Sequence, residues 1–407
     1  MEVKRKTEEF TLAAASTAAI SLVIGDCDLL REIFIRLGFP THLVRAAAVC
    51  RRWLRAASDP AFLRRFRDIH PPCLLGIYIS TFSISHSRFG ADFVPILPQP
   101  PEVSALVRRG RFGLDSYASR STCVMDCRNS RVVVNLFRDG DFTYGVHSPL
   151  HPSRGLVTFP RLPTIVTGFT VCTAYRVRRP NRGTGSLRFT TWFDSGYVLS
   201  KECDNGLAYF WFELDYCDNK EIATAHVYKL QDDAWSLQVS ATTKISKLLA
   251  SALNVLTVFL VDDKIYVGIT VHNILVLDLT SSTFSTIKYP IKHLISMNML
   301  VFDGEIMLSR ANGSGLCLVH LNKFQLHVWL LTGCDGHMGD WLLINTICLR
   351  DLCANLKISN STTEDEHDRD IYIHEVGDNA EFVFFQMHGY VLYFDVRSSS
   401  LQKTLAM

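Results

Sequence analysis

The chain has 407 residues and a formal net charge of +2, from 42 Lys and Arg against 40 Asp and Glu. Hydrophobic residues make up 48% of the composition, which favours a large packed core and excludes a disordered chain. The balanced charge provides no overall field that would draw the protein to nucleic acid or to a membrane surface. A chain of this length is expected to hold two or three domains.

Residues 1–21 begin with a short basic run and continue into a stretch rich in Ala, Ser and Thr. This order superficially resembles a secretory signal. Glu8 and Glu9 interrupt the segment, and it contains little Leu. We therefore expect a flexible tail or a weak leading helix, and no later run predicts a membrane span.

Residues 22–68 carry the start and stop signals of four short amphipathic helices. Asp26 and Asp28 are both candidates to cap the first helix, and Thr41 is the candidate for the second. Pro60 fits the first turn of the fourth. Such a unit is too small to bury a large core, which predicts that it docks onto a partner. A helical cap on the following domain is the alternative.

Four elements of this segment, in order and at consistent spacing, resemble the F-box. They are Asp28-Leu29-Leu30-x-Glu32-Ile33-x-x-Arg36-Leu37, Leu43-Val44-Arg45, Val49-Cys50-Arg51-Arg52-Trp53 and Ser58-Asp59-Pro60-Ala61-Phe62. One departure is visible, since F-boxes commonly open with Leu-Pro and this chain has Ile24-Gly25-Asp26. The surrounding sequence looks like the large F-box families of grasses and other plants.

The resemblance implies a module that docks on the Skp-type adaptor of a cullin–RING ubiquitin ligase. The candidates to contact the adaptor or to form the module's own small core are apolar: Leu29, Leu30, Ile33, Leu37, Leu43, Val44, Val49, Cys50, Trp53 and Leu54. Trp53 is the strongest single candidate, because tryptophan is enriched at the energetically dominant positions of interfaces.

The basic residues and the cysteines say less about function than the helical pattern does. Seven arginines gather in the helical segment: Arg45, Arg51, Arg52, Arg55, Arg64, Arg65 and Arg67. We expect a solvated helix face or, as the alternative, contact with an acidic protein, because the aromatics that stack on bases are not interleaved with them. The twelve cysteines are scattered and predict free thiols, and none of their pairs has a second pair at zinc-site spacing.

From residue 69 to residue 407 the texture changes to short runs rich in Val, Ile, Phe and Tyr. Strands are expected at 74–79, 131–137, 207–212, 265–270 and 274–279. The stretches 263–287, 304–329 and 381–403 each repeat the order strand, strand, polar turn and return strand, with a period of about forty residues. Together with the helices this predicts an α+β chain whose β domain resembles an irregular kelch-like β-propeller of roughly six to eight blades. A β-sandwich-like arrangement is the alternative.

Motifs for catalysis do not withstand inspection. Gly183-Thr184-Gly185 lacks the lysine of a phosphate-binding loop, and the acidic run 364–370 lacks the glycine and the spacing of a calcium loop. Four dispersed histidines are expected to be surface or core residues: His272, His293, His320 and His374. We therefore expect no catalytic site, no cofactor and no metal.

The sequence thus predicts a non-catalytic substrate-recognition subunit of an SCF-type (Skp–cullin–F-box) ubiquitin ligase. Its partners would be the adaptor, through it the cullin, and a protein substrate that the sequence does not identify. Neither nucleic acid nor membrane is expected, and the compartment would be cytoplasm, nucleus or both. Two alternatives stay open: a non-ligase F-box scaffold, and a propeller enzyme or carbohydrate-binding module with incidental helices.

Overall fold

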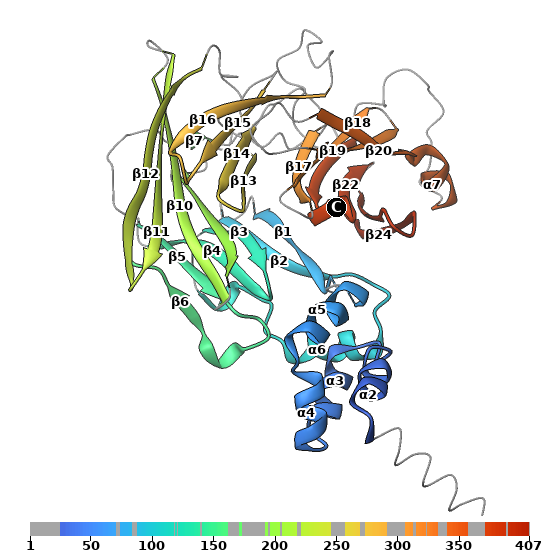
Figure 1. The fold of residues 1–407 in the computed structure, drawn as a ribbon. Coiled ribbons are helices and arrows are strands. Elements are labelled where there is room, and N and C mark those ends of the chain that lie inside the picture. The colour runs from blue at the N-terminus through green and yellow to red at the C-terminus, as the bar shows by residue number, and fades with distance from the viewer. Residues whose placement is uncertain are drawn as a thin grey trace, which may run out of the picture. The chain divides into compact units, whose positions relative to one another are not determined.

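The computed structural model describes residues 25–70, 74–83, 88–117, 119, 121–138, 141–161, 171–172, 192–193, 196–203, 206–217, 221–245, 257–268, 273–290, 306–311, 315–322, 324–332, 340–356, 371–387 and 390–406. The chain divides into two compact units, Met1–Leu75 and Gly76–Met407 (Figure 1). The predicted division falls after residue 68, and the predicted tail lies outside the described residues. Among the helices described, none is long and apolar enough to cross a membrane.

In its described residues, the first unit contains four helices: α2 (Cys27–Phe34), α3 (Pro40–Ala47), α4 (Arg51–Ala57) and α5 (Pro60–Ile69). Asp26 caps α2, since its side chain accepts hydrogen bonds from the backbone N–H groups of Asp28 and Leu29 at 2.8 and 3.2 Å. Asp28 lies inside the first turn. The expected capping of the second helix by Thr41 is wrong, because α3 already begins at Pro40, with no side-chain cap.

Phe34 lies at the centre of the small core of this helical module. Its ring meets that of Trp53 edge-on at 5.3 Å and that of Phe62 at 6.5 Å. The buried apolar side chains come from all four helices and from the turn after α2: Leu30, Phe34, Ile35, Leu43, Ala56, Ala57, Phe62 and Phe66. The module therefore has a core, but a small one.

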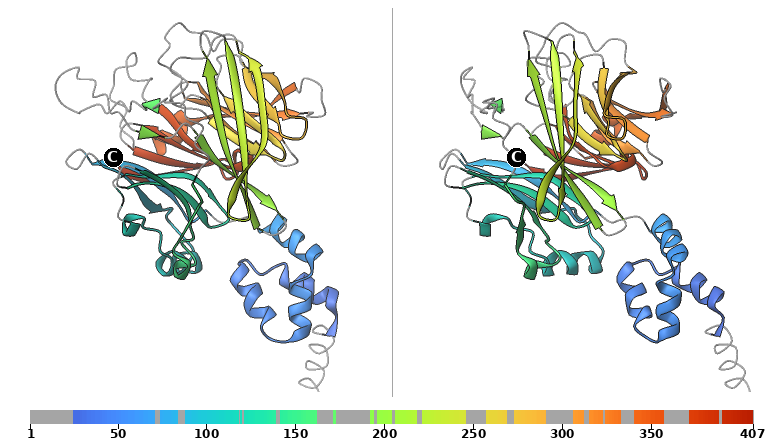
Figure 2. Two further views of the ribbon diagram at one scale, coloured as in Figure 1. Left: turned by 90° about the vertical axis from the view of Figure 1, so that its left-hand side faces the viewer. Right: turned by 60° about the vertical axis from the view of Figure 1, so that its left-hand side comes forward.

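The second unit is built from five large sheets (Figures 1 and 2). The first has six strands in the order β1 (Gly76–Ser83), β2 (Arg88–Pro95), β3 (Ser121–Arg128), β4 (Arg131–Arg138), β5 (Asp141–His147) and β6 (Leu156–Thr158). The second has four strands in the order β12 (Ala234–Lys244), β11 (Ile222–Gln231), β10 (Gly206–Cys217) and β9 (Gly196–Cys203).

The last three sheets follow the chain order strand by strand. They comprise β13 (Thr257–Val261), β14 (Lys264–Gly268), β15 (Asn273–Asp278) and β16 (Thr283–Lys288), then β17 (Ile306–Ala311), β18 (Gly315–Asn322), β19 (Gln325–Thr332) and β20 (Asp340–Cys348), then β21 (Ile371–Val376), β22 (Phe382–Met387), β23 (Tyr390–Asp395) and β24 (Ser400–Ala406). A separate two-stranded pair is formed by β7 (Val171–Cys172) and β8 (Trp192–Phe193).

Helical elements connect some of the strands. They are α6 (Pro101–Arg109), α7 (Leu349–Asn355) and the 3₁₀ turns η1 (Asp115–Tyr117), η2 (Pro152–Arg154) and η5 (Asp378–Ala380). Helix α6 lies between the second and third strands of the first sheet and buries Val103. Helix α7 follows β20 directly, so the chain leaves the last strand of the fourth sheet as a helix.

One strand of each sheet contacts the corresponding strand of the next: β3 contacts β9, β9 contacts β13, β13 contacts β17, and β17 contacts β21. These inner strands make the second unit a five-bladed β-propeller, and the β-sandwich alternative is wrong. The expected six to eight blades are also wrong. That number assumed 40–50 residues per blade, whereas the first sheet with α6 alone extends from Gly76 to Thr158.

The repeat seen in the sequence corresponds to strands of three sheets, in two different phases. Residues 263–287 cover β14 to β16 and residues 381–403 cover β22 to β24, which are the second to fourth strands of their sheets. Residues 304–329 cover β17 to β19 instead, the first to third strands. The inner strands and the strands beside them are both rich in apolar residues, as in β17 and β18, so the pattern does not distinguish an inner strand from the strand beside it.

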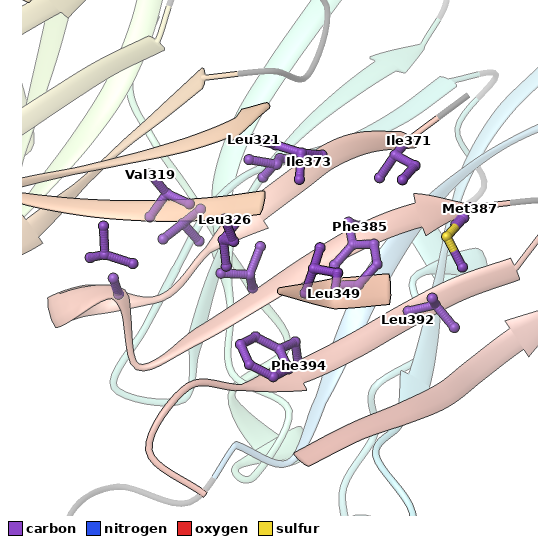
Figure 3. Close-up of a cluster of buried hydrophobic side chains, with 14 of the residues drawn as sticks. Val319, Leu321, Leu326, Leu349, Ile371, Ile373, Phe385, Met387, Leu392 and Phe394 are labelled. Carbon is purple, nitrogen blue, oxygen red and sulfur yellow. The ribbon is translucent and has the colours of Figure 1, made fainter. Parts of the chain in front are cut away.

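Apolar side chains fill the space between neighbouring sheets. Figure 3 shows the cluster between the fourth and fifth sheets, where Val319 and Leu326 point toward Ile373, Phe385 and Phe394. Similar clusters lie between the second and third sheets and between the third and fourth. Burial on both faces therefore stabilises each middle blade.

Candidate functional site

Helix α2 presents apolar side chains on two sides. Leu30 and Phe34, four residues apart, are each 1% exposed and form part of the module's core. Leu29 and Ile33 are also four residues apart, and they are 47% and 44% exposed. A helix that served only the module's own core would need only the first pair, so the second pair is available to a partner.

The next two helices and the turn between them continue this exposure. Val44 on α3 is 68% exposed, Val49 in the turn is 64% exposed and Leu54 on α4 is 52% exposed. We call Leu29, Ile33, Val44, Val49 and Leu54 the exposed apolar set. Several large apolar side chains left in water on one small unit are typical of an interaction surface.

The other predicted candidates are divided between the core and its edge. Leu30 and Leu43 are buried, while Leu37 and Trp53 are half-buried and pack against the core. Cys50 is exposed at the N-cap of α4. Part of the Trp53 side chain therefore packs against Phe34 within the module. Which of the ten residues contact an adaptor stays a prediction.

Sequence reasoning missed one exposed apolar side chain of the module. Ile69, the last residue of α5, is 51% exposed. It follows Phe62 and Phe66 at helical spacing, and both of those phenylalanines are buried. The spacing alone places Ile69 on the core side, and only the end of the helix leaves it outside.

All seven arginines of the basic cluster are exposed. Arg65 donates to Glu32 at 2.5 Å, and this hydrogen bond holds the pKa of Glu32 below its usual value. Arg31 lies 3.2 Å from Asp28 and 3.6 Å from Asp59, so it connects α2 to the start of α5. These contacts are solvent-exposed ion pairs and contribute little to stability.

A cavity of about 330 Å³ lies on the surface of the module and is lined by Cys27, Arg31, Arg52, Arg55 and Ala56. Arg52 donates to the sulfur of Cys27 at 3.7 Å. Three guanidinium groups around one hollow favour a partner that brings carboxylates. This arrangement of arginines agrees with the alternative prediction that the basic cluster contacts an acidic protein.

The inner strands of the propeller and the turn η5 carry a second group of charged and polar residues, which we call the axial cluster: Asp126, Arg128, Ser200, Arg310, Glu375 and, in η5, Asp378. Arg128 lies 3.7 Å from Asp126 and 3.6 Å from Asp378, and the hydroxyl of Ser200 donates to Asp126. Arg310 donates to the backbone oxygen of Ser200 at 3.2 Å. Within this cluster, two cations face three carboxyl groups.

The surroundings of the axial cluster shift its titrating groups. Enclosure by protein, together with charge repulsion from Asp126 and Asp378, raises the pKa of Glu375 to about 7, although the residue is exposed to solvent. Burial and the nearby Arg128 lower the pKa of Arg310 to about 10. Arg310 remains a cation at neutral pH, while Glu375 is partly protonated.

The histidines and the metal-ligand residues show no catalytic arrangement in the described part of the chain. His320 stacks on His327 at 5.8 Å, and burial lowers its pKa to about 4, which keeps it neutral. His374 contacts Gln386 at 3.0 Å. Within the described ranges, no group of three His, Cys, Asp or Glu could hold a metal ion.

Other sequence candidates lie outside the described residues. They are Gly183-Thr184-Gly185, the acidic run 364–370, His272 and His293. The cysteines whose side chains the structure describes are free thiols, as predicted: Cys27, Cys50, Cys123, Cys127, Cys203, Cys317, Cys348 and Cys353.

Comparison with protein families accounts for both units. Residues 27–69 match the F-box-like model, and this helical module followed by a five-bladed propeller defines an F-box protein with a β-propeller. Residues 123–407 match the model described as F-box protein AT5G49610-like, beta-propeller. The chain belongs to that family. The expected kelch-like type and the link to grasses stay predictions.

Solved structures are similar at low identity. An α-L-arabinanase of Penicillium chrysogenum complexed with arabinobiose is 8% identical over 82% of this chain and 86% of that chain, with a TM-score of 0.34. The Cps50 (Swd1) β-propeller domain of Myceliophteria thermophila is 9% identical over 70% and 85%, with a TM-score of 0.32. HIRA(644-1017) is 14% identical over 52% of this chain and only 53% of that chain, with a TM-score of 0.25. These values are too low to transfer an activity. A comparison with curated proteins gave no match.

Proposed function

We propose that this protein is the substrate-recognition subunit of an SCF-type (Skp–cullin–F-box) ubiquitin ligase. The observation that carries the proposal is the exposed apolar set on an F-box-like module. Leu29, Ile33, Val44, Val49 and Leu54 remain in water although the module has a core of its own. A Skp-type adaptor would cover them.

The chain would act by proximity and not by bond chemistry. The module docks on the adaptor and through it on the cullin, while the propeller holds a protein substrate. Binding raises the effective concentration of a substrate lysine near the charged ubiquitin-conjugating enzyme. The complex would work in the cytoplasm, the nucleus or both.

Adaptor binding by the full chain tests the proposal. Each member of the exposed apolar set is replaced by lysine, for example Leu54→Lys, and affinity for a purified Skp-type adaptor is measured. Leu237→Lys in the propeller is the matched control, because Leu237 is 54% exposed and Leu54 is 52% exposed. We expect at least a tenfold loss for two or more of the module variants and none for the control.

A second arm separates the ligase from a non-ligase scaffold. The adaptor-bound chain is mixed with the cullin, and formation of the ternary complex is followed by size-exclusion chromatography. A ligase subunit brings in the cullin, whereas a scaffold holds the adaptor alone. If the unmodified chain fails to bind the adaptor, the helices are incidental and the proposal is wrong.

A further inference from the structure

Strand β20 is the outer edge of the fourth sheet. Within the described residues it pairs with β19 alone, from Gln325 opposite Cys348 to Thr332 opposite Asp340. The opposite edge of β20 therefore presents backbone N–H and C=O groups that no described strand satisfies. Nine residues make this a long edge, and long apolar edges are the ones that accept an additional strand.

The edge is also apolar. Leu342, Leu343 and Ile344 are consecutive and are 55%, 43% and 49% exposed. The other exposed large apolar side chains described in the propeller are scattered: Leu97, Val157, Leu237 and Tyr372. By contrast, the outer strand of the neighbouring sheet, β16, exposes mainly polar side chains, such as Thr283 and Lys288. β20 thus exposes three consecutive apolar side chains between exposed polar ones, Asp340 before them and Asn345 and Thr346 after them, and its register with β19 shifts between Leu343 and Asn345.

Its apolar side chains continue two separate layers of the propeller. Leu343 lies opposite Trp329, and Trp341 lies opposite Leu331, on the face that packs toward the third sheet. Leu342 lies opposite Leu330, which packs toward the fifth sheet. A strand added beside β20 would extend both layers, since its side chains also alternate between the two faces.

A cavity of about 260 Å³ lies beside the start of this strand. It is lined by residues of the third and fourth sheets: Thr286, Ile287, Lys288, Tyr289, Pro290, Trp329, Asp340 and Trp341. The indole N–H of Trp341 donates to the backbone oxygen of Lys288 at 2.7 Å and holds the two sheets together there. The cavity is smaller than the sites of drug-sized ligands, and its size suits one large side chain.

We propose that β20 and this cavity bind an extended segment of the substrate protein by strand addition, with one large apolar side chain inserted between Tyr289 and Trp341. The inference rests on the proposed function, because it names the place where the receptor holds its substrate. An extended polypeptide is the one partner that offers backbone donors and acceptors together with alternating apolar side chains. The cavity has one cation, Lys288, and one anion, Asp340, so it favours a neutral segment over nucleic acid or an anionic membrane.

A phage-displayed heptapeptide library, selected against the full chain, provides the probe. Leu343→Lys changes the edge and Thr286→Phe fills the cavity. Thr283→Phe is the matched control for the cavity, because Thr283 is also exposed, lies on the same strand and does not line the cavity. Leu237→Lys is the control for the edge. We expect selected peptides to alternate apolar and polar residues and to bind both test variants at least tenfold more weakly, with both controls unchanged.

Amide hydrogen exchange of β20 and light scattering of the free chain test whether the edge of β20 is already occupied, by another segment of the chain or by a second copy. Exchange of the outward-facing amides of β20, those that do not bond to β19, is expected to be fast in the free chain and to slow at least tenfold with the peptide bound. The proposal is overturned if no peptide is selected, if the peptides bind the test variants as well as the controls, or if these outward-facing amides are already protected in the free chain. It is also overturned if the free chain is a dimer that Leu342→Lys dissociates. Adaptor binding should be unchanged in every β20 variant. If the chain binds the peptide but does not bind the adaptor, the ligase role is wrong, whereas the proposal that β20 binds an extended segment still holds.

Discussion

The guanidinium of Arg128 lies 3.6 Å from the carboxylate of Asp378 and joins the first sheet of the propeller to the last. Arg128 is 16% exposed and Asp378 is 56% exposed, so the pair lies at the edge of the solvent. The junctions between the middle sheets are filled with apolar side chains instead. A charged contact therefore takes part in closing the ring, beside apolar contacts that stack the blades.

Arg128→Ala should lower the free energy of unfolding of the full chain by about 1–2 kcal/mol, because it leaves Asp126 and Asp378 without their shared cation. Denaturant unfolding followed by tryptophan fluorescence measures the change. Arg161→Ala is the control, since its pair with Asp141 joins side chains that are 94% and 71% exposed. That variant should stay within about 0.5 kcal/mol of the parent. Equal effects of the two would contradict a special role for Arg128.

Glu375 should make the propeller less stable as pH rises. Its pKa in the folded chain is about 7, against an ordinary value of 4.5, so the folded state holds the proton more tightly than the unfolded state. The stability that this group contributes is complete below pH 4.5 and is lost as pH rises to about 7. The free energy of unfolding measured against pH should therefore fall less steeply in Glu375→Gln than in the parent. Parallel curves across that window would show that Glu375 titrates normally.

Trp53→Ala should damage the module itself, because the indole packs edge-on against Phe34. We expect a loss of about 2–3 kcal/mol, below the usual cost for a fully buried tryptophan, since Trp53 is only half-buried. Amide exchange in α2 and α4 of the full chain should accelerate, and adaptor binding should fall with it. Val44→Lys should reduce binding without that acceleration, because Val44 is 68% exposed. Unchanged exchange in Trp53→Ala would instead place Trp53 directly in the interface.

Asp59→Ala should weaken the start of α5 by about 1 kcal/mol. Its side chain accepts from the backbone N–H of Phe62 at 2.8 Å and also faces Arg31. Faster amide exchange in the first turn of α5 would report the loss. Asp28→Ala is the comparison, since Asp28 pairs with the same arginine but its side chain is 90% exposed. An equal effect in both variants would show that the ion pairs matter and the cap does not.

Local signals predicted the helical module well. Asp26 and Pro60 act through neighbours a few residues away, so their meaning is present in a short stretch of sequence. Blade number was not predictable in the same way. It depends on how much chain lies between strands, and α6 and the extra strands β1 and β2 have no counterpart in the repeat.

The division of the ten candidate residues shows the same limit. Leu29 and Leu30 are neighbours of identical type, yet one is 47% exposed and the other 1%. The helical period separates their sides, but only packing against Phe62 and Phe66 selects which side faces inward. The edge of β20 was missed because its apolar run is the same as that of a buried strand.

By itself, the sequence determined the class of each part: a capped helical module with the F-box pattern, followed by a β-rich domain. Capping and side-chain periodicity are local, so they can be read along the chain. The tertiary structure alone decided the five-bladed arrangement, the pairing of Arg128 with Asp378, the exposure of Leu54 and the open edge of β20. These depend on residues far apart in sequence, and no local pattern records which of them will meet.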